Sequence, residues 1–541
     1  MIRSLCILAA WMLPSFCQPA FGGDAHAPPE AAPVHRFRSP AYNRHFYTLD
    51  EAETNKLLTR YAHVWTYEEP VFRAFPSRSD DRLAPVHRFW SGLLNSHFYT
   101  ISEREVDTLI VAYSHAWTYE GIVFYAYPAG SQPVGTVPVH RFWSGGLGTH
   151  FYTASDRERF TLIGDAANAW KYEGVAYYVY PREDSSTVRI VKGPALTWVT
   201  PESVTIVWET DVPADTHVGY GIGYSGRGAV SDPAFVTLHK ATVSGLTPDT
   251  PYMYTVASGS VSHTASFTTA PGPGQPFRLA VYSDTQMYPD VHAQVARSVI
   301  ESQPRIALHS GDLVGAGRDL DIWETEFFGP SRELMANIPM IPVPGNHEYF
   351  GSGPPWFFYF FDRPLSEGWF ALAYGNAHFI GLNTSVPFSA GSPQHEWLLR
   401  EFASAAYRDA TWHVVVLHKP PFTATIGHGD NIAVQDQLVP LFERHGVDVV
   451  FSGHSHAYER YLHQGIHYIV TGGGGGPLYA LLPDVTPPVR QFGLTVHHHC
   501  VVDVDPAGGT LTISAVDLSG RVFDSMELHK QAPAQALTAL P

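Results

Sequence analysis

FRLAVYSD, at residues 277–284, is a short apolar run that ends on the polar residue Asp284, and in four later segments an apolar run is likewise followed by Asp, Asn or His. An amphipathic segment, VHAQVARSVIES at 291–302, separates the first two of them. Apolar runs that alternate with amphipathic segments are typical of an α/β layered domain. We therefore predict an α/β sandwich over residues 277–530. The four later segments are RIALHSGD at 305–312, MIPVPGNHE at 340–348, WHVVVLHKPPF at 412–422 and VDVVFSGHSH at 447–456.

The polar residues at these strand ends have the chemistry of a metal site. Ligand sites in layered α/β folds collect at the carboxyl ends of strands. Buried Asp and His side chains are costly there unless something satisfies them. Carboxylates, an amide oxygen and imidazoles together suit borderline metals such as zinc, iron or manganese. The predicted ligands of two such ions are Asp284, Asp312, Asn346, His418, His454 and His456.

A single carboxylate can bridge two cations, and Asp312 is the predicted bridge. Two ions about 3.5–4 Å apart would hold a hydroxide between them for in-line attack at phosphorus. His347, next to Asn346, would then protonate the leaving oxygen. The remaining ligands are divided between the ions, with Asp284 and His456 on one and Asn346, His418 and His454 on the other.

The five segments resemble, in order, the five sequence blocks of calcineurin-like metallophosphoesterases. The motif AYER at 457–460, directly after the last block, is similar to the purple acid phosphatase branch of that family. Each block alone is a weak signal, but five in order, each after a predicted strand, argue strongly for the resemblance. It implies a metal-dependent phosphoric ester hydrolase of the acid phosphatase type over residues 277–527.

Two positions depart from the purple enzymes. In those enzymes a tyrosine three residues after the bridging aspartate binds ferric iron, whereas this chain has Gly315. We therefore expect no ferric–tyrosinate centre and a colourless protein. The first block often reads Asp-x-His in the wider superfamily, and here it reads Asp284-Thr285-Gln286. Gln286 either offers its amide oxygen to the first metal or hydrogen-bonds to bound water.

Other polar segments near the blocks have two interpretations each. His428 either contacts substrate oxygens or is a plain loop histidine, and Arg460 either contacts substrate or helps to orient His456. The run Gly472–Gly476 lacks the Lys-Ser/Thr of a nucleotide P-loop, which favours a tight turn near the metal edge. The triplet His497–His499 lies in an apolar strand context, which favours core or edge filling over a third metal site.

Residues 31–182 contain the same unit three times. VHRFRSPAYNRHFYT begins at Val34, VHRFWSGLLNSHFYT at Val86 and VHRFWSGGLGTHFYT at Val139, a period of about 52 residues. Each unit predicts strand, turn, strand, short helix and closing strand. Three such units most simply form a closed, β-rich pseudo-threefold module. The segment resembles a bacterial repeat of uncharacterised function found beside secreted hydrolases, which implies a binding or targeting accessory.

The repeated histidines of this module also have two interpretations. They are either a metal site or, as threefold repetition favours, packing residues paired with backbone or carboxylate groups. Exposed aromatic residues of the module would offer flat faces to sugars, so a glycan or surface ligand is a further expectation. The six histidines are His35, His45, His87, His97, His140 and His150.

Residues 189–272 contain short alternating strands punctuated by Gly and Pro, which is typical of a β-sandwich. The stretch resembles the fibronectin type III-like sandwich that precedes the catalytic domain of purple acid phosphatases. PGPGQP at 271–276 is the predicted linker between the sandwich and the α/β domain.

Residues 1–22 are predicted to be a signal peptide, with Arg3 before an apolar stretch at 5–16 and small residues near position 22. The alternative, a membrane anchor, is disfavoured because a bilayer-spanning helix needs about 20 apolar residues. We expect a secreted or periplasmic protein with no transmembrane helix. Its mature form would keep only Cys500 and so have no internal disulfide.

The charge balance limits the partners. The 541 residues include 34 basic and 51 acidic side chains, which gives a net charge of −17. This excess of negative charge argues against nucleic acid or an anionic membrane as the main partner. A phosphorylated small molecule remains compatible, because metal ions can reverse the local field.

The sequence is compatible with three functional hypotheses. The leading hypothesis is hydrolysis of a phosphomonoester, and its close rival is a phosphodiesterase with the same ions. A third hypothesis, from a different class, is a glycan- or surface-binding protein whose phosphoesterase domain is vestigial. The intact ligand blocks and His347 weigh against degeneracy.

Overall fold

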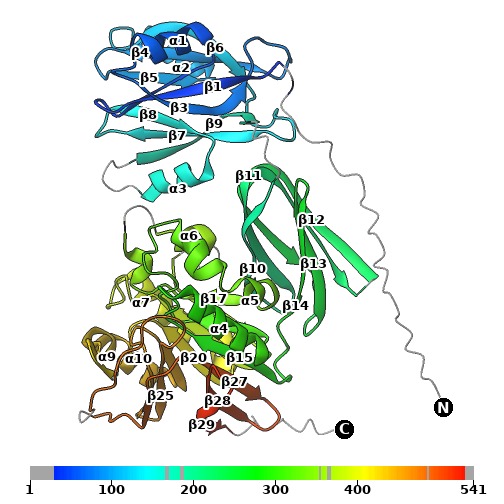
Figure 1. The fold of residues 1–541 in the computed structure, drawn as a ribbon, viewed down its shortest axis with the longest axis vertical. Coiled ribbons are helices and arrows are strands. Elements are labelled where there is room, and N and C mark those ends of the chain that lie inside the picture. The colour runs from blue at the N-terminus through cyan, green and yellow to red at the C-terminus, as the bar shows by residue number, and fades with distance from the viewer. Residues whose placement is uncertain are drawn as a thin grey trace, which may run out of the picture.

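The computed structural model contains three structured parts, with the module (blue to cyan) at one end of the molecule and the C-terminal domain at the other (Figure 1). The predicted signal peptide lies outside the described residues. Within the described part of the chain, no helix is long and apolar enough to cross a membrane, and Cys500 is a buried free cysteine. The described residues are 28, 30–164, 170–182, 188–223, 225–351, 355–361, 367–483 and 487–530.

The module consists of three units with the predicted element order. In each unit the first strand pairs antiparallel with both of the others. The first unit has β1 (Ala32–Ser39), β2 (Arg44–Thr48), α1 (Glu51–Thr59) and β3 (Thr66–Ala74). The second has β4 (Ala84–Ser91), β5 (Ser96–Thr100), α2 (Glu103–Val111) and β6 (Thr118–Ala126). The third has β7 (Val137–Ser144), β8 (Thr149–Thr153), α3 (Asp156–Gly164) and β9 (Trp170–Pro181).

A ring of three buried tyrosines joins the units. The backbone N–H of Tyr47 donates to the hydroxyl of Tyr99 (3.0 Å), that of Tyr99 to Tyr152 (2.9 Å), and that of Tyr152 to Tyr47 (3.1 Å). Each hydroxyl in turn donates to a backbone carbonyl of another member of the ring. A buried polar group without a partner costs about 1–3 kcal/mol, so this closed pattern favours the assembled module.

The sandwich is built on one long strand. β11 pairs through its first half with β10 and through its second half with β13, while β12 follows it along both halves. This pairing folds the sheet around a core that includes Trp208, Val218 and Phe267. The strands are β10 (Ile190–Val199), β11 (Ser203–Ile222), β12 (Ser225–Ser244), β13 (Pro251–Ser258) and β14 (Val261–Thr268).

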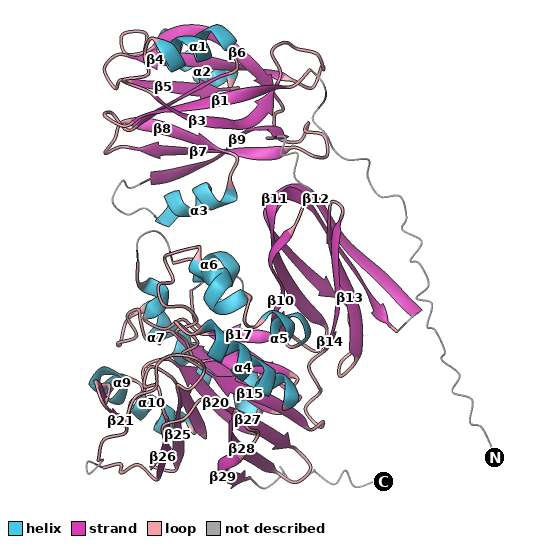
Figure 2. Ribbon diagram, viewed as in Figure 1, coloured by secondary structure: helices cyan, strands magenta, loops and turns pink. Residues whose placement is uncertain are grey.

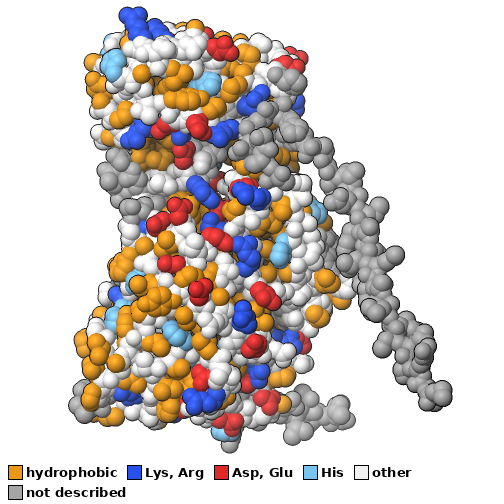
Figure 3. All heavy atoms as spheres, in the orientation of Figure 1, with side chains coloured by type: hydrophobic (Ala, Val, Ile, Leu, Met, Phe, Trp, Pro, Cys, Tyr) orange, Lys and Arg blue, Asp and Glu red, His pale blue; other side chains and the backbone are white. Residues whose placement is uncertain are grey.

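Helix α3 of the third repeat connects the module to the other two domains. Arg157 donates to the fully buried carboxylate of Glu209 on β11 (2.9 and 2.7 Å). The ring of Phe160 lies 5.1 Å from the ring of Trp356 in the C-terminal domain. Acidic and basic side chains lie together at this junction (Figure 3). The residues equivalent to Phe160 in the other two repeats are Asn55 and Asp107, and both are exposed.

The C-terminal domain has two sheets with helices on their outer sides (Figure 2). The first sheet has the order β17 (Met340–Pro342), β16 (Ile306–His309), β15 (Phe277–Tyr282), β27 (His498–Asp505), β28 (Thr510–Asp517) and β29 (Val522–His529). The second has β18 (Phe370–Tyr374), β19 (Ala377–Leu382), β20 (Trp412–Leu417), β23 (Val449–Ser452), β25 (Ile466–Thr471), β24 (Tyr458–His463) and β26 (Phe492–Leu494). The α-helices are α4 (Pro289–Glu301), α5 (Arg332–Asn337), α6 (Phe357–Phe360), α7 (Pro393–Phe402), α8 (Ala405–Asp409), α9 (Ile432–Gln437) and α10 (Val439–His445).

Strand β20 shows why the apolar runs are continuous. Val414 and Val416 pack into the core between the two sheets, whereas Val415 and Leu417 pack against the helices outside the second sheet. Successive side chains of a strand point to opposite faces, so a strand covered on both faces must be apolar throughout. This arrangement confirms the predicted α/β sandwich.

Candidate metal centre

The predicted ligands follow strands whose carboxyl ends meet at one edge of the two sheets. β15, β16 and β17 run parallel, as do β19, β20 and β23. Asp284, Asp312 and His454 each lie within three residues of a strand end and have positive φ angles of 60°, 56° and 70°. Left-handed conformations cost non-glycine residues on the order of 1–2 kcal/mol and concentrate at functional sites.

Three ligand atoms converge on one nitrogen of His418. Its Nε2 lies 3.1 Å from Asp312 Oδ2, 3.0 Å from Asn346 Oδ1 and 3.2 Å from His454 Nδ1. A ring nitrogen carries at most one hydrogen, so it cannot donate to all three. In addition, His418 Nδ1 lies 2.9 Å from the carbonyl oxygen of Ser310, and in the neutral ring donation there leaves a lone pair on Nε2. These residues therefore fit a metal ion, and Asp312, His418 and His454 offer ligand atoms within 4.8 Å of one another.

A second group adjoins the first. His456 Nε2 lies 3.4 Å from Asp284 Oδ1 and 3.2 Å from Gln286 Nε2, while its Nδ1 lies 2.7 Å from the Pro477 carbonyl oxygen. The Oε1 atom of Gln286 is buried and has no hydrogen-bond partner among the described residues. The groups interlock, because the backbone N–H of His454 donates to the Asp284 carboxylate (2.9 Å). This orphaned oxygen and the paired carboxylate suit a second cation.

Burial and neighbouring charges set the pKa values of the histidines in the site. Burial alone would lower the pKa of His418, but the adjacent Asp312 and Asp284 carboxylates raise it to about 9. Burial and the charge of His418 lower the pKa of His454 to about 2. Burial opposes ionisation of Asp312, but His418 beside it holds the pKa of that carboxyl below its ordinary value. Metal ligation requires the same ionised carboxylates, together with neutral imidazoles.

His347 is held beside Asp312. Its Nδ1–H donates to the carbonyl oxygen of Gly315 (2.6 Å), and its Nε2 lies 3.9 Å from Asp312 Oδ2. The backbone N–H of Gly315 donates to Glu326 Oε2 (2.6 Å). A Cβ atom at residue 315 would lie 3.4 Å from that same oxygen, so Glu326 borders the position where the purple enzymes have tyrosine. His347 thus presents Nε2 toward the site.

Glu348 has a role that sequence reasoning missed. The side chain is fully buried and accepts backbone N–H bonds from Asp312 (3.0 Å), Leu313 (2.8 Å) and Gly345 (2.6 Å). Burial and the charge of Asp312 raise its pKa to about 8. Because its carboxylate accepts backbone N–H bonds from both loops, Glu348 fixes the loop that carries Asp312 to the loop that carries His347. The signal available in the sequence was an acid that directly follows the GNH motif.

His428 lies beside the predicted metal ligand His454. The interpretation in which it contacts substrate oxygens requires this position. Its ring is 4.4 Å from the ring of His454, and it stacks on Tyr479 at 5.1 Å. Tyr479 also stacks on His456 at 4.3 Å with an interplanar angle of 7°. The sequence contains no signal for Tyr479, because its contacts depend on how a long loop returns to the site.

The structure does not bring Arg460 to the centre. Its guanidinium is ion-paired with Asp524 on β29 (2.7 and 3.1 Å) and also donates to Gln491 (2.7 Å). In this structure Arg460 links the two sheets, and a contact of Arg460 with substrate stays a prediction. Asp524 is distant in sequence, so the local motif did not reveal this partner.

The glycine run is a tight turn at the metal edge, as expected. A Cβ atom at Gly472 would collide with the carbonyl oxygen of Ser455, and the N–H of Gly476 donates to the carbonyl oxygen of Asp284 (2.7 Å). The buried rings of His498 and His499 hydrogen-bond to Thr471 (3.2 Å) and Ser302 (2.9 Å). These protein partners agree with core filling.

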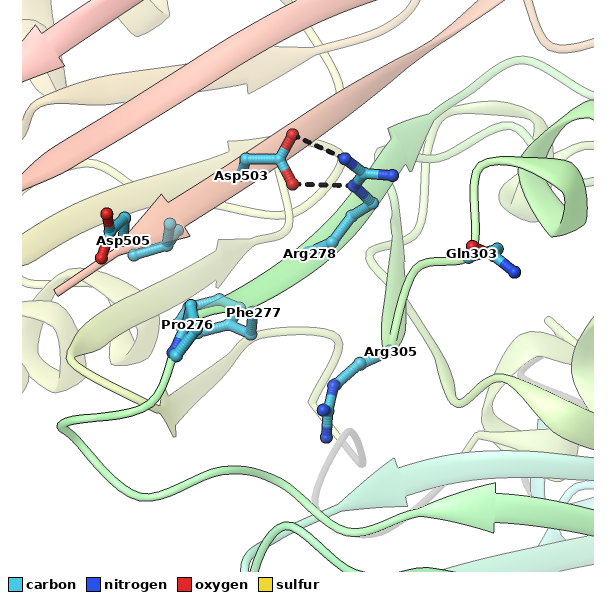
Figure 4. A pocket seen from close by; sticks show the side chains of 8 residues that line it. Pro276, Phe277, Arg278, Gln303, Arg305, Asp503 and Asp505 are labelled. Atoms are coloured by element: carbon cyan, nitrogen blue, oxygen red, sulfur yellow. Dashed lines mark hydrogen bonds and ion pairs between the residues drawn. The ribbon is translucent and has the colours of Figure 1, made fainter. Parts of the chain in front are cut away.

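A hollow of about 460 Å³ lies elsewhere, at the opposite end of β15 (Figure 4). Phe277 begins this strand, whereas Asp284 follows its other end. Arg278, which lines the hollow, is ion-paired with Asp503 at 2.7 and 3.0 Å. Arg278 and Asp503 pair with each other, and the hollow lies at the end of β15 remote from Asp284, so it is not the candidate site.

Comparison with known proteins agrees with this fold. The family model of calcineurin-like phosphoesterases matches residues 277–458, and that of a domain of unknown function (DUF5648) matches residues 33–180. Residues 277–458 therefore form a calcineurin-like phosphoesterase domain, and its curated relatives include purple acid phosphatases.

Among these relatives, purple acid phosphatase 1 of Ipomoea batatas is 29% identical over 249 residues, which are 41% of this chain and 51% of that protein. The Fe(3+)-Zn(2+) purple acid phosphatase 12 of Arabidopsis thaliana is 27% identical over 41% of this chain and 52% of its own length. The chain thus spans about half the length of these relatives. The purple acid phosphatase PPD1 of yellow lupin shares the fold, with a TM-score of 0.56 and 19% identity over 67% of this chain and 77% of that one.

Proposed function

We propose that the chain hydrolyses phosphomonoesters with two metal ions held at the strand-end site. The observation that carries the proposal is the convergence of Asp312, Asn346 and His454 on a single nitrogen of His418. Two such ions would neutralise the phosphate charge and supply a hydroxide nucleophile at neutral pH. The proposed ligands are Asp284, Asp312, His456 and, through its amide oxygen, Gln286 for one ion, and Asp312, Asn346, His418 and His454 for the other.

The chain's own residues would position the ester and transfer the proton. His347 is oriented through Nδ1 by the Gly315 carbonyl, so a protonated Nε2 can donate to the leaving oxygen. His428, between His454 and Tyr479, can donate to a phosphate oxygen. Glu348 keeps the Asp312 loop and the His347 loop in register.

The metals proposed are iron, zinc or manganese, without a tyrosinate ligand. The support is Gly315, which has no side chain to bind a metal, and the three atoms nearest to a residue-315 Cβ are the two carboxylate oxygens of Glu326 and the Cγ of Met287. The metal-loaded protein should be colourless in the visible range. A charge-transfer band of the tyrosinate–iron type would contradict this assignment.

Phosphate release from matched esters tests the function. Purified chain should hydrolyse 4-nitrophenyl phosphate, should lose the activity with a chelator, and should regain it with added metal. Bis(4-nitrophenyl) phosphate should react more slowly, and a faster diester reaction would favour the phosphodiesterase alternative. Asp503→Asn, far from the centre on β27, is the control variant. Failure on both esters with two metals bound would contradict both hypotheses.

A second proposal concerns the remaining domains. We propose that residues 31–182 form a pseudo-threefold module with a glycan or surface ligand, and that residues 189–272 form a fibronectin type III-like sandwich before a catalytic domain at 277–530. The support for the ligand is the equivalent exposure of Tyr67, Tyr119 and Tyr172, at 36%, 42% and 40%. A glycan array with the full chain should lose its signals when all three tyrosines are replaced by alanine. Wild-type silence would contradict the proposed glycan ligand.

We also propose export to the periplasm or the medium, supported by the N-terminal segment. Fractionation and N-terminal sequencing of the expressed protein should find a mature chain that begins near residue 23. An uncleaved cytoplasmic chain would contradict export.

A further inference from the structure

Several apolar side chains near the metal centre remain in water. Met287, Phe350 and Ile426 are exposed by 51%, 48% and 57%. Each adjoins a residue of the site: Met287 follows Gln286, and Ile426 lies in the turn that leads to His428. The ring of Phe350 is 4.7 Å from the ring of His347.

These side chains belong to two sides of the centre. On the His347 side, the Cγ atom of Met287 lies 3.7 Å from the position of a Cβ at Gly315, whose carbonyl holds His347. Phe350 lies on this side as well.

On the His428 side, the β21–β22 hairpin (Ala424–Thr425 and His428–Gly429) runs beside the segment that carries Tyr479. The backbone N–H of Ile426 donates to Ala480 (2.9 Å), and Thr425 pairs with Leu481. Tyr479 itself stacks on His456 and His428. The apolar rim, defined as Met287, Phe350, Ile426 and Tyr479, therefore contacts both histidines that would meet the ester.

The position of these side chains decides what they can bind. Phosphate oxygens would be held by the metals, so the rim is left for the alcohol part of the ester. Apolar side chains beside a few convergent polar groups are typical of a pocket for an apolar ligand.

We propose that the apolar rim binds the leaving group and that the enzyme prefers phosphomonoesters of aromatic or long-chain alcohols. This inference rests on the proposed phosphomonoesterase function and specifies its substrate class. Esters of small polar alcohols, sugar phosphates and nucleotides would be turned over less efficiently, because their alcohol parts leave the rim in water.

Ethyl phosphate and hexyl phosphate provide a matched test, since their leaving alcohols have nearly the same pKa. A fully buried methylene contributes about fourfold in binding, so four extra methylenes that are even partly buried should raise kcat/KM about tenfold or more. Phe350→Ser and Ile426→Ser should lower this hexyl-to-ethyl ratio, mainly through a higher KM for hexyl phosphate. Val522→Ser, at a 52% exposed position on the edge strand β29, is the control and should leave the ratio unchanged.

The outcomes separate this inference from the function on which it rests. Equal kcat/KM for the two esters in the wild type would overturn the apolar rim while leaving phosphomonoesterase activity established. A ratio that Phe350→Ser and Ile426→Ser leave intact would likewise overturn it. Failure to hydrolyse either ester with two metals bound would contradict the proposed function itself.

Discussion

The repeat module and the metal centre both contain clustered histidines, but the two sets of rings have different surroundings. In the module, each ring has partners within its own repeat. His87 Nδ1 hydrogen-bonds to the hydroxyl of Tyr119 (2.8 Å), and His97 Nε2 lies 3.5 Å from Glu120. The other two repeats have the same pairs. Burial, with the nearby charge of Arg88, lowers the pKa of His97 to about 3, as expected for a neutral packing residue.

The metal centre has more ligand atoms than hydrogens to satisfy them. Asp312, Asn346 and His454 all approach one nitrogen of His418, and the pKa of that ring is raised instead of lowered. Residue type alone therefore does not distinguish a structural histidine from a metal ligand. What distinguishes the metal ligand is the number of potential ligand atoms that approach a single ring nitrogen.

The largest expected difference between the two regions is in activity. Asp312→Asn should lower kcat/KM at least about 10³-fold, because it removes the carboxylate shared by both proposed ligand sets. Glu120→Gln, which alters the comparable carboxylate of the module, should leave kcat/KM within about twofold. Initial rates at saturating metal measure both. Retention of a tenth of wild-type activity in Asp312→Asn would remove the basis for the proposed bridge.

Metal removal should separate the regions in stability. At a free metal concentration 100 times Kd, one bound ion stabilises the folded domain by about 2.7 kcal/mol. A chelator should therefore lower the melting temperature of the C-terminal domain and leave that of the module unchanged. Calorimetry with hydrogen-exchange mass spectrometry assigns each transition. An equal shift in both regions would mean that the module also binds metal.

The reverse test targets the module. Tyr99→Phe removes a hydroxyl that accepts from Tyr47 and donates to its backbone, leaving both backbone groups unpaired. Module stability should fall by about 1–3 kcal/mol with unchanged kcat/KM. Denaturant unfolding measures this effect, with Tyr113→Phe at a 50% exposed position as the control. A loss of activity without a loss of stability would contradict a structural role.

The smallest expected effect is the release of protons when the metal binds. The pKa of His418, about 9 in the metal-free fold, lies above its ordinary value of 6.5. Its contribution to stability is therefore complete below pH 6.5 and is lost as the pH rises through 9. Because a metal binds the neutral ring, binding at pH 7 should release about one proton from His418. Calorimetric titration in buffers of different ionisation enthalpy measures the release, and His418→Gln should abolish it.

The sequence was informative where the signals are local. The apolar strands, the polar residues at their ends and the three repeats follow from periodicity and residue type. The parallel strand order explains why segments as distant as Asp284 and His456 meet. Arg460 shows the limit of this reasoning, because its motif lies at the site while its partner Asp524 is on another sheet.

Contacts between domains also could not be predicted from the sequence. Phe160 differs from Asn55 and Asp107 when the repeats are aligned, which marks the third repeat as different. Its partner Trp356 lies almost 200 residues away, and only the folded chain brings the two rings together. Tyr479 is similar, since its stacking on His456 depends on the return of the glycine-rich loop.

The number of metal ions bound per chain decides whether the strand-end residues form a two-metal site. Elemental analysis of purified wild-type protein should find two metal ions per chain, and Asn346→Ala should hold fewer and lose most of its activity. Two ions per chain with wild-type activity in Asn346→Ala would contradict the proposed ligand set. A fully active wild-type chain with no bound metal would contradict the account as a whole.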